Sequence, residues 1–111
     1  MENEAAFFKV LADPTRLRLA VLLSIQGETC VCGLAEALDA PEYNISRHLG
    51  IMRSAGLVEA RREGTWMYYR LSEARNRLEE CLQECFRDCL ADHPTVKTDV
   101  KRLSKTACKT N

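Results

Sequence analysis

The sequence predicts a mainly helical domain with a single β-hairpin. Residues 28–56 contain a short helical pattern, a break at Asp39-Ala40-Pro41 and a second helical pattern. Two short segments rich in aromatic and apolar residues follow, separated by Glu63-Gly64, which favours a hairpin. Helical spacing of apolar residues recurs on both sides of this region. With 111 residues, the chain is long enough for one compact domain and too short for two.

The charge composition limits the choice of partners. The 16 Lys and Arg residues equal the 16 Asp and Glu residues, so a nucleic-acid partner would need a local basic patch. No apolar run approaches the roughly 18 residues of a membrane span, and the start, Met-Glu-Asn-Glu, lacks the features of a signal peptide. We therefore expect a cytoplasmic protein with no membrane partner. There the six Cys residues should stay reduced, which favours metal binding or redox sensing over a disulfide framework.

The first two helices are predicted around one strong boundary signal. Residues 4–12 carry several apolar side chains and are expected to form the first helix. Asp13 is a good N-cap, and Pro14 suits the first position of the next helix. The residues from 17 to 25 are almost all apolar, which indicates a buried helix, and Gly27 fits its end.

The next two helices are predicted to form a helix-turn-helix. Thr29 is expected to cap the third helix, and Pro41 is expected to open the fourth at its first position. In the fourth helix Ile45, Leu49 and Met52 recur at four- and three-residue spacing, so they should face the core.

The opposite face of the fourth helix is polar and is the candidate DNA-reading surface. Its residues include Tyr43, Asn44, Ser46 and Arg47. Such a set suits a helix in a major groove, where Arg, Asn and Ser side chains can meet base edges or phosphates. An ordinary solvated helix face is the alternative. His48 falls nearer the inward stripe and is expected to be a half-buried structural histidine.

Residues 57–62 and 65–71 are predicted to be two strands, in the position of the wing of a winged helix. Arg61 and Arg62 lie near the predicted tip, where they would contact phosphates or simply act as solubilising charge. The predicted fold class is therefore a winged helix-turn-helix, mainly α with a β-hairpin wing.

The last long helix is expected to begin with Ser72 as its cap and to end at Pro94. It carries one apolar seam, formed by Leu78, Cys81, Leu82, Cys85, Phe86, Cys89 and Leu90. A one-sided helix must bury its seam against something, and a second copy of the chain is a natural choice, which predicts a homodimer. Residues 1–93 would then form the DNA-binding and dimerisation domain. Residues 94–111 would form a basic C-terminal tail, either a frayed helix or a mobile segment.

Several short motifs occur in one order along most of residues 5–71. They are Leu11-Ala12-Asp13-Pro14-Thr15-Arg16-Leu17-Arg18, Cys30-Val31-Cys32, Leu34-Ala35, Ser46-Arg47-His48-Leu49, Ala55-Gly56-Leu57-Val58, Arg62-Glu63-Gly64 and Tyr68-Tyr69. With these motifs the chain resembles the ArsR-SmtB family of metal-responsive bacterial repressors. The resemblance implies a homodimeric winged helix-turn-helix that binds double-stranded operator DNA and leaves it when metal binds. It also implies that the first and last helices form the dimer interface.

Cys30 and Cys32 look like the inducer site of the family's arsenite sensors, which implies arsenite or antimonite as the inducer and no organic cofactor. Two residues apart on a regular helix lie about 200° apart, so these thiols can share one ion only if the helix begins at or after Cys30. Thiolates select soft ions, whereas zinc would want four ligands. The arsenite sensors often carry a further Cys three residues on, and here that position is Ala35.

The third ligand has several candidates. Cys81, Cys85 and Cys89 lie in the apolar seam, where interface packing is favoured over a second soft-metal site. Cys108 lies in the tail, and ordering a mobile tail would cost ~1–2 kcal/mol per fixed residue. We therefore expect Cys30 and Cys32 to hold the metalloid, with the third sulfur supplied from solution.

Three functions compete at this point. The first is the metalloid-responsive repressor, and the second is a redox-responsive repressor, or one that responds to cadmium, lead or zinc, with the same fold. The third is a thiol enzyme, but the sequence offers no Cys-His catalytic motif, no Gly-rich phosphate loop and no paired acid and base. We therefore expect that the chain is not an enzyme.

Overall fold

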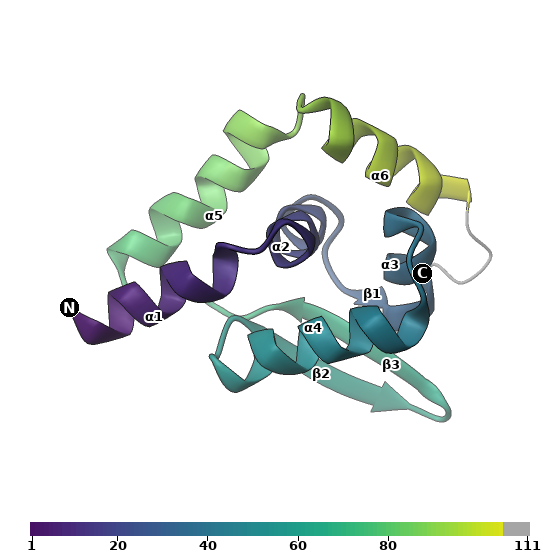
Figure 1. Cartoon of the computed structure of the whole chain (residues 1–111), viewed down its shortest axis with the longest axis horizontal. Helices are drawn as coiled ribbons and strands as arrows, with labels where there is room; N and C mark the ends of the chain where they lie inside the picture. Colours follow the sequence, from purple (N-terminus) through teal and green to yellow (C-terminus); the bar gives the residue numbers. More distant parts are fainter. Residues whose placement is uncertain (106–111) are drawn as a thin grey trace.

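The structure is a computed structural model, and it describes residues 1–105. Figure 1 shows helices packed around a central helix, with a small sheet along one side. In chain order the elements are α1 (Glu2–Leu11), α2 (Pro14–Gln26), β1 (Thr29–Cys30), α3 (Val31–Leu38), α4 (Glu42–Ser54), β2 (Val58–Glu63), β3 (Trp66–Leu71), α5 (Arg77–Leu90) and α6 (Pro94–Lys105). The predicted fold class, mainly α with a β-hairpin wing, is confirmed.

Helix α2 is the centre of the molecule, and its start was predicted correctly. The Asp13 carboxylate accepts hydrogen bonds from the backbone N–H groups of Thr15 and Arg16, at 2.9 and 3.1 Å, and Pro14 is the first helical residue. Residues 19–23 are all buried. Gly27 ends the helix with a φ of 79°, a conformation that favours glycine.

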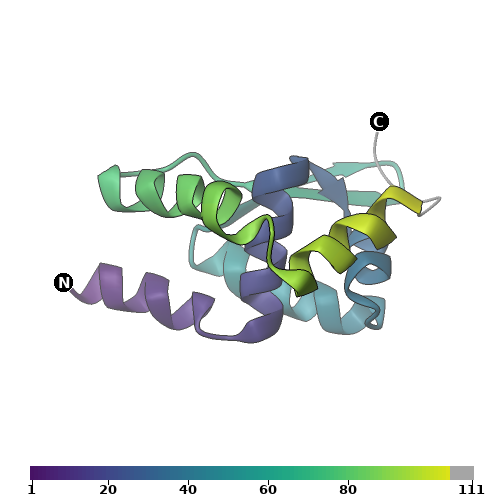
Figure 2. The same ribbon diagram turned by 90° about the horizontal axis from the view of Figure 1, so that it is seen from above.

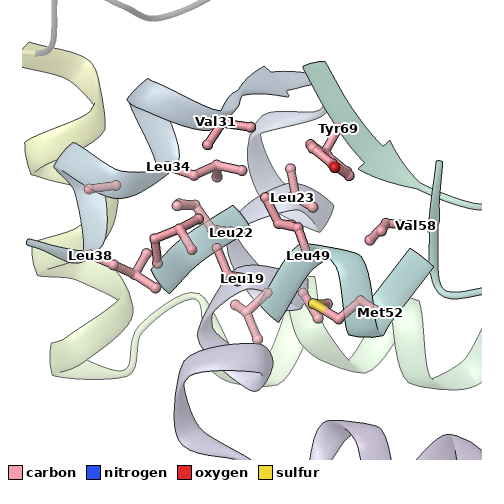
Figure 3. Close-up of a cluster of buried hydrophobic side chains, with 14 of the residues drawn as sticks. Leu19, Leu22, Leu23, Val31, Leu34, Leu38, Leu49, Met52, Val58 and Tyr69 are labelled. Atoms are coloured by element: carbon pink, nitrogen blue, oxygen red, sulfur yellow. The ribbon is translucent and has the colours of Figure 1, made fainter. Parts of the chain in front are cut away.

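The helix-turn-helix is α3, a short turn and α4. Asp39 makes the turn in the left-handed conformation, with a φ of 54°, which Asp tolerates better than most residues. Pro41 is the N-cap of α4 rather than its first residue, because Glu42 is the first residue with helical geometry. Ile45, Leu49 and Met52 are fully buried, as predicted. Figure 3 shows Leu49 and Met52 among the leucines of α2 and α3.

The sheet has three antiparallel strands in the order β1-β3-β2. Strands β2 and β3 form the predicted hairpin, and Gly64 turns it with a φ of 63°. Strand β1 was not predicted. It places Thr29 opposite Tyr69 and Cys30 opposite Tyr68, so the segment that enters α3 is tied to the second strand of the wing.

Two predicted helix caps are wrong. Thr29 does not cap α3, because it pairs with β3 and its hydroxyl donates to the Gly27 carbonyl at 2.9 Å. Ser72 does not cap α5, since residues 72–76 form a loop and Asn76 is the N-cap, with its side-chain oxygen accepting from the Glu79 N–H at 3.0 Å. In both cases another residue, later in the chain, offers the capping oxygen or sulfur.

The C-terminal region differs from the expected frayed helix or mobile tail. Pro94 opens α6 instead of only ending α5, and α6 runs to Lys105 with Val96, Asp99 and Leu103 buried. In Figures 1 and 2, α6 lies beside α3. The division of the chain at residue 93 remains a prediction, and residues 106–111 lie outside the described part.

Within residues 1–105, every helix is either too short or too polar to cross a lipid bilayer.

Candidate functional site

The thiol pair, Cys30 and Cys32, lies where β1 passes into α3. Cys30 is the N-cap of the helix, so Cys30 is extended and Cys32 lies in the first turn. This start fulfils the condition for two thiols at this spacing to meet, and the two Sγ atoms are 3.1 Å apart. The Cys30 Sγ also accepts a hydrogen bond from the Gly33 N–H at 3.3 Å. Both sulfurs therefore lie at the N-terminal end of α3, and Cys binds soft metal ions through its sulfur as the thiolate.

The two thiols differ in accessibility. Cys30 is buried, whereas Cys32 is partly exposed. Cys32 borders one depression of about 360 Å³ with Ser46 and Met67, and another of about 530 Å³ with Glu36 and Glu42. A small solute can therefore approach the pair from the side of Cys32.

The other described thiols lie elsewhere. Cys81, Cys85 and Cys89 are on α5, and all three are exposed in the single chain while Phe86 turns inward. The pKa of the Cys85 thiol is raised by its hydrogen bond and charge interaction with Cys89. The structure thus brings Cys30 and Cys32 together and leaves the α5 thiols as a separate stripe. Cys108 lies outside the described residues, and within residues 1–105 no three His, Cys, Asp or Glu side chains cluster closely enough to hold a metal ion.

The candidate DNA-reading face of α4 is open to solvent. Tyr43, Ser46 and Arg47 are exposed and Asn44 is half-buried, while Arg47 donates to the Asn44 side-chain oxygen at 2.9 Å. This contact orients the guanidinium along the outer face of the helix. All four residues predicted on this face are therefore on one surface.

His48 lies under that surface and is buried more deeply than predicted. Its Nδ1 is 3.3 Å from the Arg16 guanidinium, which can only donate, so Nδ1 is the accepting nitrogen. Burial lowers the pKa of His48, Arg47 and Arg16 lower it further, and Asp13 acts in the opposite direction. The imidazole thus connects α2 with α4 through Arg16.

The two wing arginines point to opposite faces of β2, because side chains alternate along a strand. Arg61 is held by two carboxylates, Glu28 at 2.8 Å and Glu63 at 2.9 Å, and its guanidinium stacks over the Tyr68 ring at 4.7 Å. Arg62 is exposed and lies opposite Met67, on the face that also carries the buried Tyr69. The charge of Arg61 is thus partly neutralised within the protein.

Three residues near the thiol pair were missed from the sequence. Glu28 pairs with Arg61, Tyr68 pairs with Cys30 across the sheet, and Gly33 lets α6 approach closely. The position of Glu28, an acidic residue directly before Thr29, was the sequence feature that could have indicated a partner for a wing arginine. The role of Tyr68 depends on the pairing of β1 with β3, and that of Gly33 on the packing of α6 against α3. Neither contact can be predicted from the residues nearby in the sequence.

The sequence comparisons all match this chain to transcriptional regulators. The family model described as "Bacterial regulatory protein, arsR family" matches residues 13–60. The arsenical resistance operon repressor of Escherichia coli is 54% identical over 65 residues, which cover 59% of this chain and 56% of that protein. An uncharacterized HTH-type transcriptional regulator of Methanocaldococcus jannaschii is 45% identical over 74 residues, covering 67% and 83%. A cadmium resistance regulatory protein CadC homolog of Staphylococcus aureus is 38% identical over 69 residues, covering 62% and 57%.

Solved structures agree with the fold. The homodimeric winged helix-turn-helix domain of Mb0332 from Mycobacterium bovis, a possible ArsR-family regulator, superposes with a TM-score of 0.63 at 38% identity, covering 77% of this chain and 72% of that one. The match spans only slightly more than half the length of the Escherichia coli and Staphylococcus aureus relatives. The relatives are described as repressors and regulators rather than enzymes.

Proposed function

The chain belongs to the arsR family of bacterial regulatory proteins, and we propose that it is a metalloid-responsive transcriptional repressor acting in the cytoplasm. It binds operator DNA as a homodimer and dissociates when arsenite or antimonite binds Cys30 and Cys32. The observation that carries the proposal is the 3.1 Å separation of the two Sγ atoms at the start of α3, directly before the recognition helix α4.

The chemistry of the thiol pair favours a soft, thiophilic ion. Two converging sulfurs at a helix N-terminus suit trivalent arsenic or antimony better than a hard cation, which would select oxygen ligands. Zinc would require four ligands in a structural site. The Escherichia coli relative, described as an arsenical resistance repressor, supports the same inducer class.

DNA binding is proposed for the outer face of α4 and for the wing. Tyr43, Asn44, Ser46 and Arg47 would enter the major groove, and Arg62 would contact a phosphate beside it. Arg61 remains a candidate contact, although its pairing with Glu28 and Glu63 makes it a weaker one than Arg62.

A homodimer is proposed through α1 and α5. These helices lie along one side of the molecule in Figure 1, and Phe8 on α1 exposes 47% of its surface. On α5 the Cys81, Cys85 and Cys89 thiols are exposed on the outer side. A second copy would cover these groups, and the Mycobacterium bovis structure is described as a homodimer.

Two routes connect the thiol pair with the DNA-binding elements. The first runs through α3 and the Asp39 turn into α4. The second runs through β1, where Cys30 pairs with Tyr68 of the wing. Emptying a nearly full operator requires a difference in ligand affinity of roughly 5.5 kcal/mol between the two conformations. Metalloid–thiolate bonds that distort the first turn of α3 would act on both routes at once.

A second candidate is a repressor of the same fold that responds to cadmium or another soft metal. The observation in its favour is the similarity to the Staphylococcus aureus cadmium resistance regulator. A redox-responsive repressor is the further alternative, in which the reduced thiols would not respond to metals.

The test is a gel-shift titration of the DNA upstream of the gene under reducing conditions. Arsenite, antimonite, cadmium, lead and zinc are added separately to the protein–DNA complex. Release by arsenite and antimonite at the lowest concentrations supports the proposal. Release by cadmium or lead alone would identify the repressor that responds to another soft metal. Release only after the reductant is replaced by an oxidant would identify the redox-responsive repressor.

A further inference from the structure

The proposed DNA and thiol sites leave one sequence motif unexplained, Ala55-Gly56-Leu57-Val58 at the end of the recognition helix α4. In the structure, Gly56 lies against the guanidinium of Arg75, two residues before the start of α5. We propose that Arg75 fixes the orientation of α4 relative to the dimerisation helix α5 and thereby sets the spacing of operator half-sites that the dimer accepts. This inference rests on the proposed function and deepens it, because it concerns how two copies of α4 are held apart on DNA.

The backbone that follows α4 comes very close to Arg75. A Cβ on Gly56 would lie 2.7 Å from the Arg75 Nη1 atom and 3.4 Å from its Cζ atom, so any side chain there would displace the guanidinium. Gly56 also has a φ of 80°, a second and independent reason for glycine at this position. The guanidinium lies at the C-terminal end of α4, where the helix dipole favours a positive charge. The glycine of the motif therefore makes room for a cation that touches the end of the recognition helix.

Glu79, in the first turn of α5, holds the same guanidinium. Its carboxylate accepts a hydrogen bond from the Arg75 Nε at 3.0 Å and lies 2.8 Å from the Arg75 Nη2 atom. It also accepts from the backbone N–H of Arg75 at 2.9 Å, and Glu79 is only 7% exposed. A two-pronged contact of this kind fixes the plane of the guanidinium more firmly than a single hydrogen bond. Arg75 and Glu79 thus form a joint, the Arg75–Glu79 joint, between the end of α4 and the start of α5.

The joint lies where the recognition helix meets both helices proposed to bind the second copy. A cavity of about 410 Å³ beside it is lined by residues of α1, the end of α4 and the start of α5, among them Phe7, Ala55, Arg75 and Glu79. In Figures 1 and 2, α1, the end of α4 and the start of α5 lie on the same side of the molecule. A change in the joint would therefore alter the position of α4 relative to the dimer axis.

The spacing of operator half-sites gives a readout for this position. A dimeric helix-turn-helix protein contacts two half-sites whose separation matches that of its recognition helices. One base pair inserted at the operator centre moves a half-site by about 3.4 Å along the duplex. A firm joint should reject this DNA, whereas a loosened joint should tolerate it. The spacing ratio is defined as the affinity for the operator divided by the affinity for the operator with the inserted base pair.

The test compares full-length variants on these two DNAs. Footprinting on the DNA upstream of the gene locates the operator, and fluorescence anisotropy measures the spacing ratio. Arg75→Met keeps the length of the side chain but removes the fork, and its spacing ratio should fall about fivefold or more, the lower limit of typical coupling between sites. Arg75→Lys keeps the charge without the fork and should show a smaller fall. Glu79→Gln, a milder change on the other side of the joint, should lower the ratio as well. Lys101→Ala removes an exposed charge from α6 and should keep the wild-type ratio.

Sedimentation and circular dichroism separate positioning from stability. If Arg75 served only the stability of the fold, a folded and dimeric Arg75→Met would lose the same factor of affinity for both DNAs. Its spacing ratio would then equal that of the wild type, which would overturn the inference. Equal affinity of the wild type for the two DNAs would overturn it too. If Arg75→Met does not fold, Glu79→Gln decides by the same criterion. A wild type that is monomeric, or that binds no upstream DNA, would instead defeat the proposed function.

Discussion

The guanidinium of Arg61, on the wing, lies 2.8 Å from the carboxylate of Glu28, two residues before the thiol pair. The pair connects the wing to the segment that enters α3, in parallel with the pairing of Cys30 and Tyr68. The hydrogen bonds that Arg61 donates to Glu28 and to Glu63 raise the pKa of Arg61. Arg61 thus already forms ion pairs with Glu28 and Glu63. This distinguishes it from Arg62, the next residue of β2.

We predict that Arg62→Ala and Arg61→Ala affect DNA binding differently. Each phosphate contact contributes roughly 0.9 to the slope of log affinity against log salt. Arg62→Ala should reduce this slope by about one contact and lower affinity for all sequences alike. Arg61→Ala should leave the slope nearly unchanged, because its charge is balanced by Glu28 and Glu63. Fluorescence anisotropy at several salt concentrations measures both, and equal changes in the two variants would contradict the distinction.

Arg47→Ala should weaken operator binding by about 1–3 kcal/mol if the guanidinium reads a base. Arg47 is exposed on α4, and Asn44 orients its side chain. The loss should be larger for the operator than for unrelated DNA, since a phosphate contact would affect both equally. Lys101→Ala on α6 removes one positive charge from another exposed surface and serves as the control. A specificity ratio unchanged by Arg47→Ala would remove this residue from the reading surface.

Cys30→Ser and Cys32→Ser should each keep operator binding and lose release by arsenite. Cys30 is the N-cap of α3, and Ser is among the best N-cap residues, so the helix should still form. Neither thiol is on the outer face of α4 that is proposed to enter the groove. Gel-shift titration with arsenite measures the effect. Normal release in both variants would place the sensor elsewhere in the protein.

The elements that the sequence predicted correctly are those decided by local chemistry. The start of α2 depends only on the adjacent residues Asp13 and Pro14. The inner face of α4 can be identified from the spacing of Ile45, Leu49 and Met52. The thiol pair also belongs to this class, because the two Cys residues meet through the geometry of one helix start.

The elements that the sequence did not predict depend on distant partners. Thr29 has a side chain that suits an N-cap, but it pairs with Tyr69 and is part of strand β1. Cys30 is therefore the N-cap of α3. Residues 94–111 were expected to form a tail because most of them are polar or basic. The buried carboxylate of Asp99 becomes favourable only through Arg18, which is 81 residues away in the sequence. The place of α6 beside α3 therefore could not be read from local patterns.

His48 should make the protein less stable in mildly acidic solution. Burial holds its pKa below the ordinary value of 6.5, so folding favours the neutral imidazole. The stability from this depressed pKa is complete above pH 6.5 and is lost as the pH falls through the folded-state pKa. Urea unfolding between pH 7.5 and pH 5, a range above the ordinary carboxyl pKa values, should show this loss.

In His48→Gln the loss in that range should be much smaller, because the amide oxygen can accept from Arg16 without titrating. His93→Gln removes the other, exposed imidazole and should keep the wild-type behaviour. An equal loss in His48→Gln and the wild type would assign the effect to another group.

Arg18→Ala should lower the free energy of unfolding by about 3 kcal/mol, the lower end of the range for breaking a buried ion pair. The substitution removes the cation 2.7 Å from the Asp99 carboxylate, which is 1% exposed in the wild type, and within residues 1–105 it leaves Arg102 as its ion-pair partner at 4.0 Å. The double variant Arg18→Met/Asp99→Leu should recover most of the loss, since apolar replacement of both partners of a buried pair is often neutral. Arg70→Ala breaks an exposed pair with Glu59 and should change stability little.

If α6 were only loosely attached, all three variants would unfold at the same urea concentration as the wild type. A loss in Arg18→Ala that the double variant restores would instead show that α6 is packed firmly on α2 at this position, with its last turn beside Gly33 of α3.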